Sequence, residues 1–216
     1  MKTRFKLFIC LLLGYVGFGQ QEAQFTNYMY NTINVNPAYA GSRGVMSIFG
    51  LYRTQWVGLE GAPDTGTFSI NTPFENSRLG LGLSFINDRI GPTTTNNISV
   101  DVSYSIPTSE TWKLSFGVKG SASLFNLDVN KLTTYQGDPN LVNIKNDLSP
   151  NVGAGIYLHN DKTYVGFSIP YMLETTRFND NSRAVYMERM HYYLIAGHVF
   201  DLCSAVKFKP AVLGKA

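Results

Sequence analysis

The stretch Trp112–Phe125, which reads WKLSFGVKGSASLF, decides the fold of this chain. Apolar and polar residues alternate along it. The apolar positions are Leu114, Phe116, Val118, Ala122 and Leu124, and the polar positions are Lys113, Ser115, Lys119, Ser121 and Ser123. Because successive side chains of a β-strand point to opposite faces, the stretch predicts a strand with one apolar face and one polar face.

The same alternation recurs from residue 44 onward, between short runs of Gly, Asn, Asp and Pro. Many of these segments have about the 9–11 residues that a tilted transmembrane strand needs. Such strands face lipid on one side and a polar lumen on the other, so the pattern predicts an all-β fold, an antiparallel transmembrane β-barrel of the outer membrane. The candidate strands are 44–56, 64–72, 78–88, 96–106, 111–127, 149–158, 162–170, 189–200 and 205–213.

A soluble secreted β-sandwich adhesin also has alternating strands and is the alternative fold. Charged residues make up 15% of the chain and aromatic residues 13%, whereas soluble domains average about 25% charged residues. Low charge with abundant Tyr and Phe fits strands that face lipid and end in aromatic girdles. The composition therefore favours the barrel over the sandwich.

The first residues predict export. Residues 1–19 combine a basic start, the apolar run Leu7–Val16 and small residues before Gln20, which is the pattern of a cleaved signal peptide. A lipoprotein signal is disfavoured because Cys10 lies in the middle of the apolar run. No later stretch approaches the roughly 20 apolar residues of a transmembrane helix. We therefore expect the mature chain to leave the cytoplasm and to reach the cell outer membrane.

The connections between candidate strands differ in length. Asn160–Asp161 predicts a tight hairpin turn, and Pro107–Glu110 predicts another short one. Short turns at one end and long loops at the other are the layout of outer-membrane barrels, in which the long loops face outward. The longer connections are 57–63, 89–95, 128–148 and 171–188.

Nine is an odd number of strands, whereas bacterial single-chain barrels close with even numbers. The sequence also stops at Leu213–Ala216, in or just after a strand. We therefore expect residues 44–216 to form part of a larger barrel, truncated to about nine strands.

Residues 20–43 differ from the rest of the chain because they are rich in Asn, Gln and Tyr. We expect a turn or short helix near Phe25–Asn31, and a segment that plugs the lumen or packs across its mouth. The alternative is a docking surface for a periplasmic partner, because amphipathic tyrosines suit both kinds of site. Its candidates are Tyr28, Tyr30 and Tyr39.

Nothing in the sequence predicts catalysis, a cofactor or a metal site. His191 and His198 are an odd number of residues apart, so they would point to opposite faces of one strand and cannot form a two-His metal pair. The runs 137–140 and 179–181 resemble calcium loops but fit plain turns better. After cleavage Cys203 is the only cysteine, which excludes an internal disulfide.

The charged residues of the chain suggest few further candidates for a functional role. Its net charge of +3 is not concentrated in a basic cluster, so no nucleic acid partner is expected. A few charged residues fall on the polar face of their strands, where we expect them to line the lumen and to need partners. They are Arg53, Asp101, Lys113 and Lys119.

Four short motifs resemble one known family. Residues 24–31 read QFTNYMYN, residues 36–42 read NPAYAGS, residues 53–56 read RTQW, and residues 90–92 read IGP. This pattern resembles the PorP/SprF family of type IX secretion system membrane proteins of Bacteroidetes. The resemblance extends from about residue 20 to the end. The candidate family-signature and partner-binding residues are Tyr28, Met29, Asn31, Asn36, Pro37, Tyr39, Gly41, Arg53, Gln55 and Trp56.

The resemblance implies a non-enzymatic outer-membrane barrel that is larger than nine strands. It implies a component or cargo partner of type IX secretion, which supports secretion or surface retention of adhesins, as in gliding motility. The partners would be outer-membrane lipid, a secreted cargo's C-terminal domain or a surface adhesin, and periplasmic components of the system. A general diffusion porin is the alternative function for a barrel of this pattern.

Overall fold

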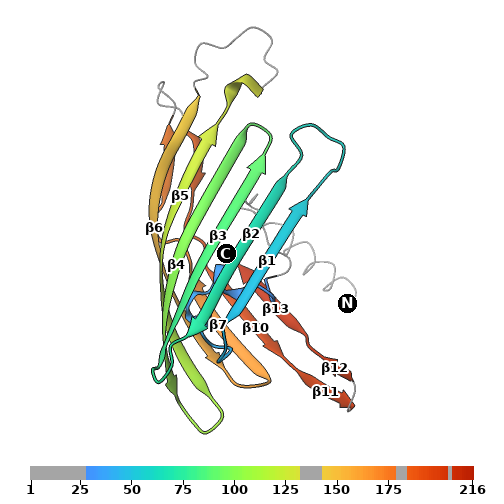
Figure 1. The fold of residues 1–216 in the computed structure, drawn as a ribbon, viewed down its shortest axis with the longest axis vertical. Coiled ribbons are helices and arrows are strands. Elements are labelled where there is room, and N and C mark those ends of the chain that lie inside the picture. The colour runs from blue at the N-terminus through green and yellow to red at the C-terminus, as the bar shows by residue number, and fades with distance from the viewer. Residues whose placement is uncertain (1–27, 132–142, 179–183, 204–205) are drawn as a thin grey trace, which may run out of the picture.

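The computed structural model describes residues 28–131, 143–178, 184–203 and 206–216. Nine antiparallel strands form one sheet that curls into a half-barrel (Figure 1). In sheet order they are β1 (Ser47–Thr54), β2 (Asp64–Pro73), β3 (Leu79–Ile90), β4 (Thr93–Pro107), β5 (Lys113–Leu127), β6 (Ile144–His159), β7 (Thr163–Ile169), β10 (Tyr193–His198) and β13 (Ala211–Lys215). This architecture confirms the predicted barrel-type fold. A second sheet packed face to face, as a sandwich requires, is absent from the described residues.

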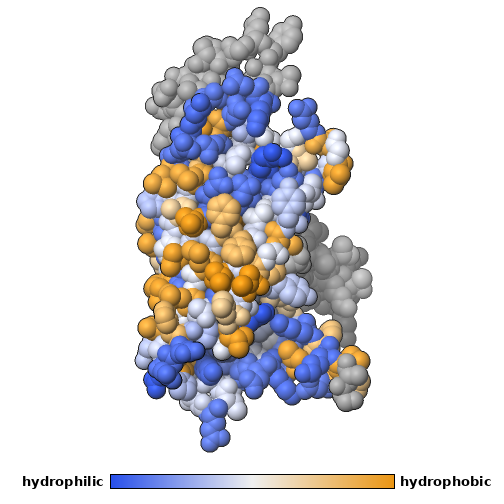
Figure 2. Space-filling model, viewed as in Figure 1, coloured by the Kyte–Doolittle hydropathy of each residue, from blue (hydrophilic) through white to orange (hydrophobic). Residues whose placement is uncertain are grey.

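The two faces of the sheet have the reverse burial of a soluble protein. Ser115 and Ser84 on the concave face are 0% and 1% exposed, whereas Val118 and Val152 on the convex face are 60% and 49% exposed. Figure 2 shows apolar residues gathered in a band across the middle of the molecule, with hydrophilic residues at both ends. An apolar outer band around a polar interior is what a lipid-facing barrel wall needs.

Two two-stranded hairpins extend from the sheet. One pairs β8 (Thr175–Phe178) with β9 (Ala184–Glu188), and the other pairs β11 (Phe200–Cys203) with β12 (Val206–Phe208). The single strands predicted at 189–200 and 205–213 are therefore wrong, because each is split between the sheet and a hairpin. Pro210 lies at the split and has no amide hydrogen to continue the ladder. Its carbonyl accepts from His198 N at 3.2 Å, where β10 ends.

Connection lengths depart from the prediction at three places. Residues 89–95 are not a long loop, because β3 and β4 run almost to the turn, where Gly91 has a φ of +55°. The connection predicted at 128–148 is shorter than expected, since β6 already begins at Ile144. The connection predicted at 171–188 contains the β8–β9 hairpin. The turns at 74–78, 108–112 and 160–162 are short and lie together at the lower end of Figure 1.

Short helical turns occupy the hollow of the sheet. They are α2 (Thr32–Val35) and η1 (Pro37–Tyr39), whereas η2 (Val129–Lys131) lies in the β5–β6 connection. The helix comes later than the predicted turn or helix near Phe25–Asn31, part of which lies outside the described residues. Pro37 fits the start of η1, because its fixed φ suits a helix and its missing N–H is not needed there.

Within the described residues, no helix has both the length and the apolar character needed to cross a membrane. The predicted signal peptide at 1–19 and the runs at 137–140 and 179–181 lie outside the described residues. The division into 1–19, 20–43 and 44–216 stays a prediction.

Candidate functional site

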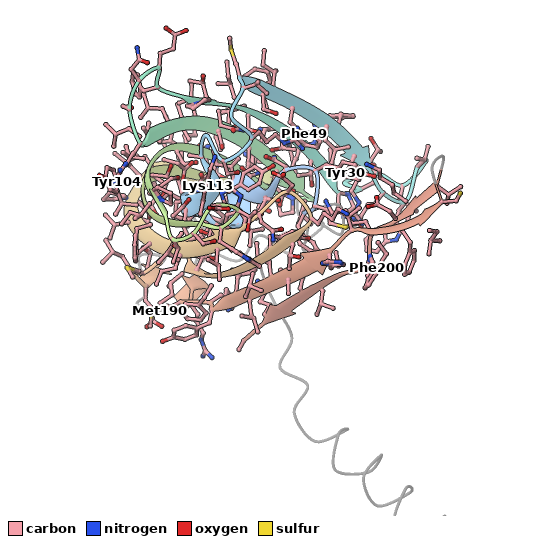
Figure 3. All side chains as sticks on the ribbon, turned by 90° about the horizontal axis from the view of Figure 1, so that it is seen from below. Tyr30, Phe49, Tyr104, Lys113, Met190 and Phe200 are labelled. Atoms are coloured by element: carbon pink, nitrogen blue, oxygen red, sulfur yellow. The ribbon has the colours of Figure 1, made fainter. Side chains whose placement is uncertain are left out.

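The N-terminal segment, residues 28–41, lies in the hollow of the half-barrel. Ile33, Asn36 and Ala38 are 1%, 0% and 0% exposed, although they belong to a segment with no strand. Figure 3 looks into the barrel from the short-turn end and shows the sheet curving around its interior. The segment covers the polar face of β3 to β7 and separates it from the solvent.

Glycines on the concave face make room for this segment. A Cβ at Gly117 would clash with the backbone of Ala38, and a Cβ at Gly80 would clash with the carbonyl of Ala40. A Cβ at Gly155 would likewise meet the Asn36 side chain. The inward alternation of Gly with Ser is therefore explained by close approach of a second piece of backbone, which only glycine allows.

Serines on the same face satisfy the polar groups of the segment. Ser103 Oγ donates to the Ala40 carbonyl at 2.6 Å, and Ser168 Oγ donates to the Val35 carbonyl at 2.8 Å. Ser69 Oγ donates to Asn31 Oδ1 at 2.7 Å. Because buried polar groups without partners are costly, these bonds allow an irregular segment to lie inside the sheet.

Asn36 joins the segment to the wall at its most buried point. Its Nδ2 donates to the Ile156 carbonyl at 3.0 Å, and its Oδ1 accepts from Ala38 N at 3.0 Å as the cap of η1. Both ends of the amide are used, so neither a carboxylate nor an apolar side chain replaces it. These two bonds give a structural reason for an Asn at this position, directly before Pro37.

A buried ion pair connects the wall to the same segment. Lys119 Nζ lies 3.1 Å from Asp101 Oδ1, and the two side chains are 1% and 0% exposed. Nζ also donates to the Ile33 carbonyl at 3.3 Å. Both residues were predicted to line the lumen and to need partners, but their pairing was missed. The turn at 108–112 could have predicted this pairing, because Asp101 precedes the turn by as many residues as Lys119 follows it. The register of β4 and β5 places the two residues opposite each other.

An aromatic cluster joins the segment to the wall, toward the short-turn end. Tyr157 packs edge-on against Tyr39 with ring centroids 5.6 Å apart, and its ring lies 5.9 Å from that of Tyr164. Tyr28 is 6% exposed and belongs to the same cluster. Tyr30, in contrast, is 64% exposed. Of the three tyrosines predicted for plugging or docking, only Tyr30 is well exposed for contact with another protein.

The candidate signature residues fall into two groups. Tyr28, Met29, Asn31, Asn36, Pro37, Tyr39 and Gly41 come together in the hollow of the sheet, whereas Arg53, Gln55 and Trp56 lie where β1 leads into the β1–β2 loop. Gly41 has a φ of +68° and lies against Pro73 and Gly80, so its place in the motif has a backbone reason. Most of the first group is buried by the wall, whereas Met29, Tyr39 and Gly41 are half-buried.

The second group includes an exposed apolar loop. Trp56 is 68% exposed and has a φ of +49°, and its carbonyl accepts from Leu59 N at 3.1 Å. Val57 and Leu59 are 86% and 65% exposed. Gln55 N donates to the Pro63 carbonyl at 2.9 Å, which closes the base of the loop. The loop is therefore shaped by its own hydrogen bonds and presents its apolar tip outward.

Comparison with known proteins identifies the family of the chain. Residues 17–216 match the family model described as type IX secretion system membrane protein PorP/SprF. No curated protein and no solved structure matches the chain. The match covers nearly the whole sequence, including both motif groups and all nine strands of the sheet. The chain therefore belongs to the PorP/SprF family of type IX secretion system membrane proteins.

Proposed function

We propose that the protein is a non-enzymatic barrel component or cargo partner of the type IX secretion system in the outer membrane. In this role it supports secretion or surface retention of adhesins. The observation that carries the proposal is the filled interior of the half-barrel. Ile33, Asn36 and Ala38 occupy the space that a diffusion porin uses as its channel, and this favours a binding role over a conducting one.

The two faces and two ends of the sheet suit the proposed partners. The apolar convex face suits outer-membrane lipid. By the usual orientation of such barrels, the end with the long connections faces outward, toward a cargo's C-terminal domain or a surface adhesin. The short-turn end then faces periplasmic components of the system. Export by a cleaved signal peptide at 1–19 completes this proposal.

The candidate cargo surface lies at the end with the long connections. It comprises the β1–β2 loop with its exposed Trp56 and the connections 128–148 and 171–188, only parts of which are described. Exposed aromatic side chains are typical anchors of protein interfaces. The buried part of the N-terminal segment instead supports the barrel from inside.

Deletion of the gene tests the proposed role. We expect surface adhesins of the deletion strain to be lost from the outer membrane and to accumulate inside the cell. Complementation with the wild-type gene restores them, and complementation with Trp56→Ala restores them only in part. Normal adhesin display in the deletion strain would contradict the proposal.

Conductance separates the proposal from a general diffusion porin. The full-length protein, reconstituted in planar bilayers, is expected to be silent because its interior is occupied. Stable ion-conducting steps would favour the porin instead.

A further inference from the structure

A pocket of about 420 Å³ opens at the short-turn end of the half-barrel. Its walls come from four separate parts of the chain: residues between 29 and 44, the start of β5, the β6–β7 turn with the strand ends beside it, and the two residues Val199 and Lys209. Volumes of roughly 300–1,000 Å³ are typical of ligand sites in proteins. The pocket is therefore large enough for several atoms of a ligand.

The charges around the pocket are mostly positive. Asp161 is the single carboxylate among its lining residues. Lys162 is paired with Asp201, which lies outside the lining, with Nζ 2.6 Å from Oδ2. Positive charges around a concave site raise the local concentration of anions. The basic lining residues are Arg43, Lys113, Lys162 and Lys209.

Three of these cations have no carboxylate partner in the described part of the chain, and one of the three, Lys209, lies over the Tyr164 ring. Arg43 donates from Nε to the Tyr39 hydroxyl at 2.8 Å and from Nη1 to Ser47 Oγ at 3.0 Å, so neutral oxygens fix its guanidinium. Lys113 is exposed and lies on the inner side of the sheet (Figure 3). Both are therefore free to pair with an anion that enters the pocket.

Aromatic rings line the pocket beside the cations. Tyr39, Tyr157 and Tyr164 are among its lining residues, and Lys209 Nζ lies 5.5 Å from the centre of the Tyr164 ring. Such rings offer apolar contact area at low cost in side-chain entropy. A small inorganic anion would leave this area unused, whereas a peptide that carries both carboxylates and apolar side chains would use both features.

We propose that this pocket binds an acidic peptide segment of a partner protein. Its carboxylates pair with Lys113 and Arg43, and an apolar side chain packs against the half-buried rings of Tyr39 and Tyr164. The proposal goes beyond the proposed function, because it names a site, residues and a ligand chemistry that the secretion role does not require.

Binding to the purified full-length protein in detergent tests this proposal. The probe is a fluorescein-labelled peptide of alternating Glu and Phe, and the matched peptide has Gln in place of Glu. We expect the Glu peptide to bind at least about tenfold more tightly, and the difference to shrink as the ionic strength rises. Lys113→Gln should weaken the Glu peptide about fivefold. The control Lys131→Gln removes the same charge from η2, at the opposite end of the half-barrel, and should leave affinity unchanged.

Three results would overturn the proposal. These are equal binding of the Glu and Gln peptides, equal weakening by the Lys113 and Lys131 variants, and displacement of the peptide by equimolar inorganic phosphate, which would mark a plain anion site. None of them depends on adhesin secretion. A failure here is therefore distinguishable from a failure of the proposed function, which the deletion strain reports.

Discussion

At the scale of single residues, the ion pair of Lys119 with Asp101 and the amide of Asn36 are the most demanding positions. All three side chains are at most 3% exposed, and each bonds to another element. Buried charges are tolerated only when they are paired, and buried amides only when they are hydrogen-bonded. Their identities are therefore dictated by the wall and the segment together.

Removal of one charge from the buried pair should be strongly destabilising. Lys119→Met leaves the Asp101 carboxylate buried without a cation, which costs about 3–5 kcal/mol. Lys119→Met combined with Asp101→Leu should recover most of that loss, because no isolated charge remains. Unfolding in detergent by urea measures both variants. The control Lys145→Met, at an exposed position of β6, should unfold like the wild type. Equal stability of Lys119→Met and this control would show that the pair is unimportant.

At the scale of elements, β5 shows how one strand meets two environments. Gly117 faces the N-terminal segment, whereas a Cβ at Gly120, on the opposite face, would meet no atom within 4 Å. Glycine is therefore required at position 117, whereas a larger side chain fits at position 120. This difference gives a matched pair of variants.

Gly117→Val should expel the N-terminal segment from the hollow, because the new side chain collides with the Ala38 backbone. Limited proteolysis of the detergent-solubilised protein would then cut within residues 28–41, which we expect to be protected in the wild type because most of them are buried. Gly120→Val should leave the segment protected. Retained protection in Gly117→Val would mean that the segment does not lie against β5.

The salt bridge of Lys162 with Asp201 ties the β6–β7 turn to the β11–β12 hairpin. Lys162 lowers the pKa of the Asp201 carboxyl below its ordinary value of 3.8, through a hydrogen bond and its positive charge. The contact is therefore fully present above pH 3.8 and is lost as the pH falls through the lowered pKa. We expect amide exchange in the hairpin, normalised for intrinsic rates, to rise between about pH 5 and pH 2. Asp201→Asn should abolish that rise, and an unchanged rise in this variant would assign it to another group.

At the scale of the whole molecule, the alternation along the chain was enough to predict a barrel-type sheet. Each strand of the sheet overlaps one of the predicted ranges, because lipid on one side and a packed polar interior on the other impose a period of two. The hairpins were missed because β8 and β11 have four residues each, too few for a pattern to stand out. The inward glycines and serines were recognised as a polar face, but the segment that covers them comes from far away in the sequence.

The two groups of signature residues show the same limit. A motif marks positions but does not say whether a side chain is buried or exposed. Asn36 is buried because Gly155 and Gly166 leave space for its amide. Trp56 is exposed because a hydrogen bond from Gln55 N to the Pro63 carbonyl closes the base of its loop and leaves the tip outside. Only the register of the sheet and the path of the N-terminal segment separate these two cases.

The central claim is that the N-terminal segment fills the interior of this barrel wall, and a disulfide tests it most directly. Asn31 and Ser69 contact each other through their side chains, at 2.7 Å between Oδ1 and Oγ. In a Cys203→Ser background, the account predicts that Asn31→Cys with Ser69→Cys forms a disulfide in isolated outer membranes, seen by mass spectrometry as two joined peptides. The control Tyr30→Cys with Ser69→Cys should stay reduced. A reduced Asn31–Ser69 pair, or equal cross-linking of both pairs, would contradict the account.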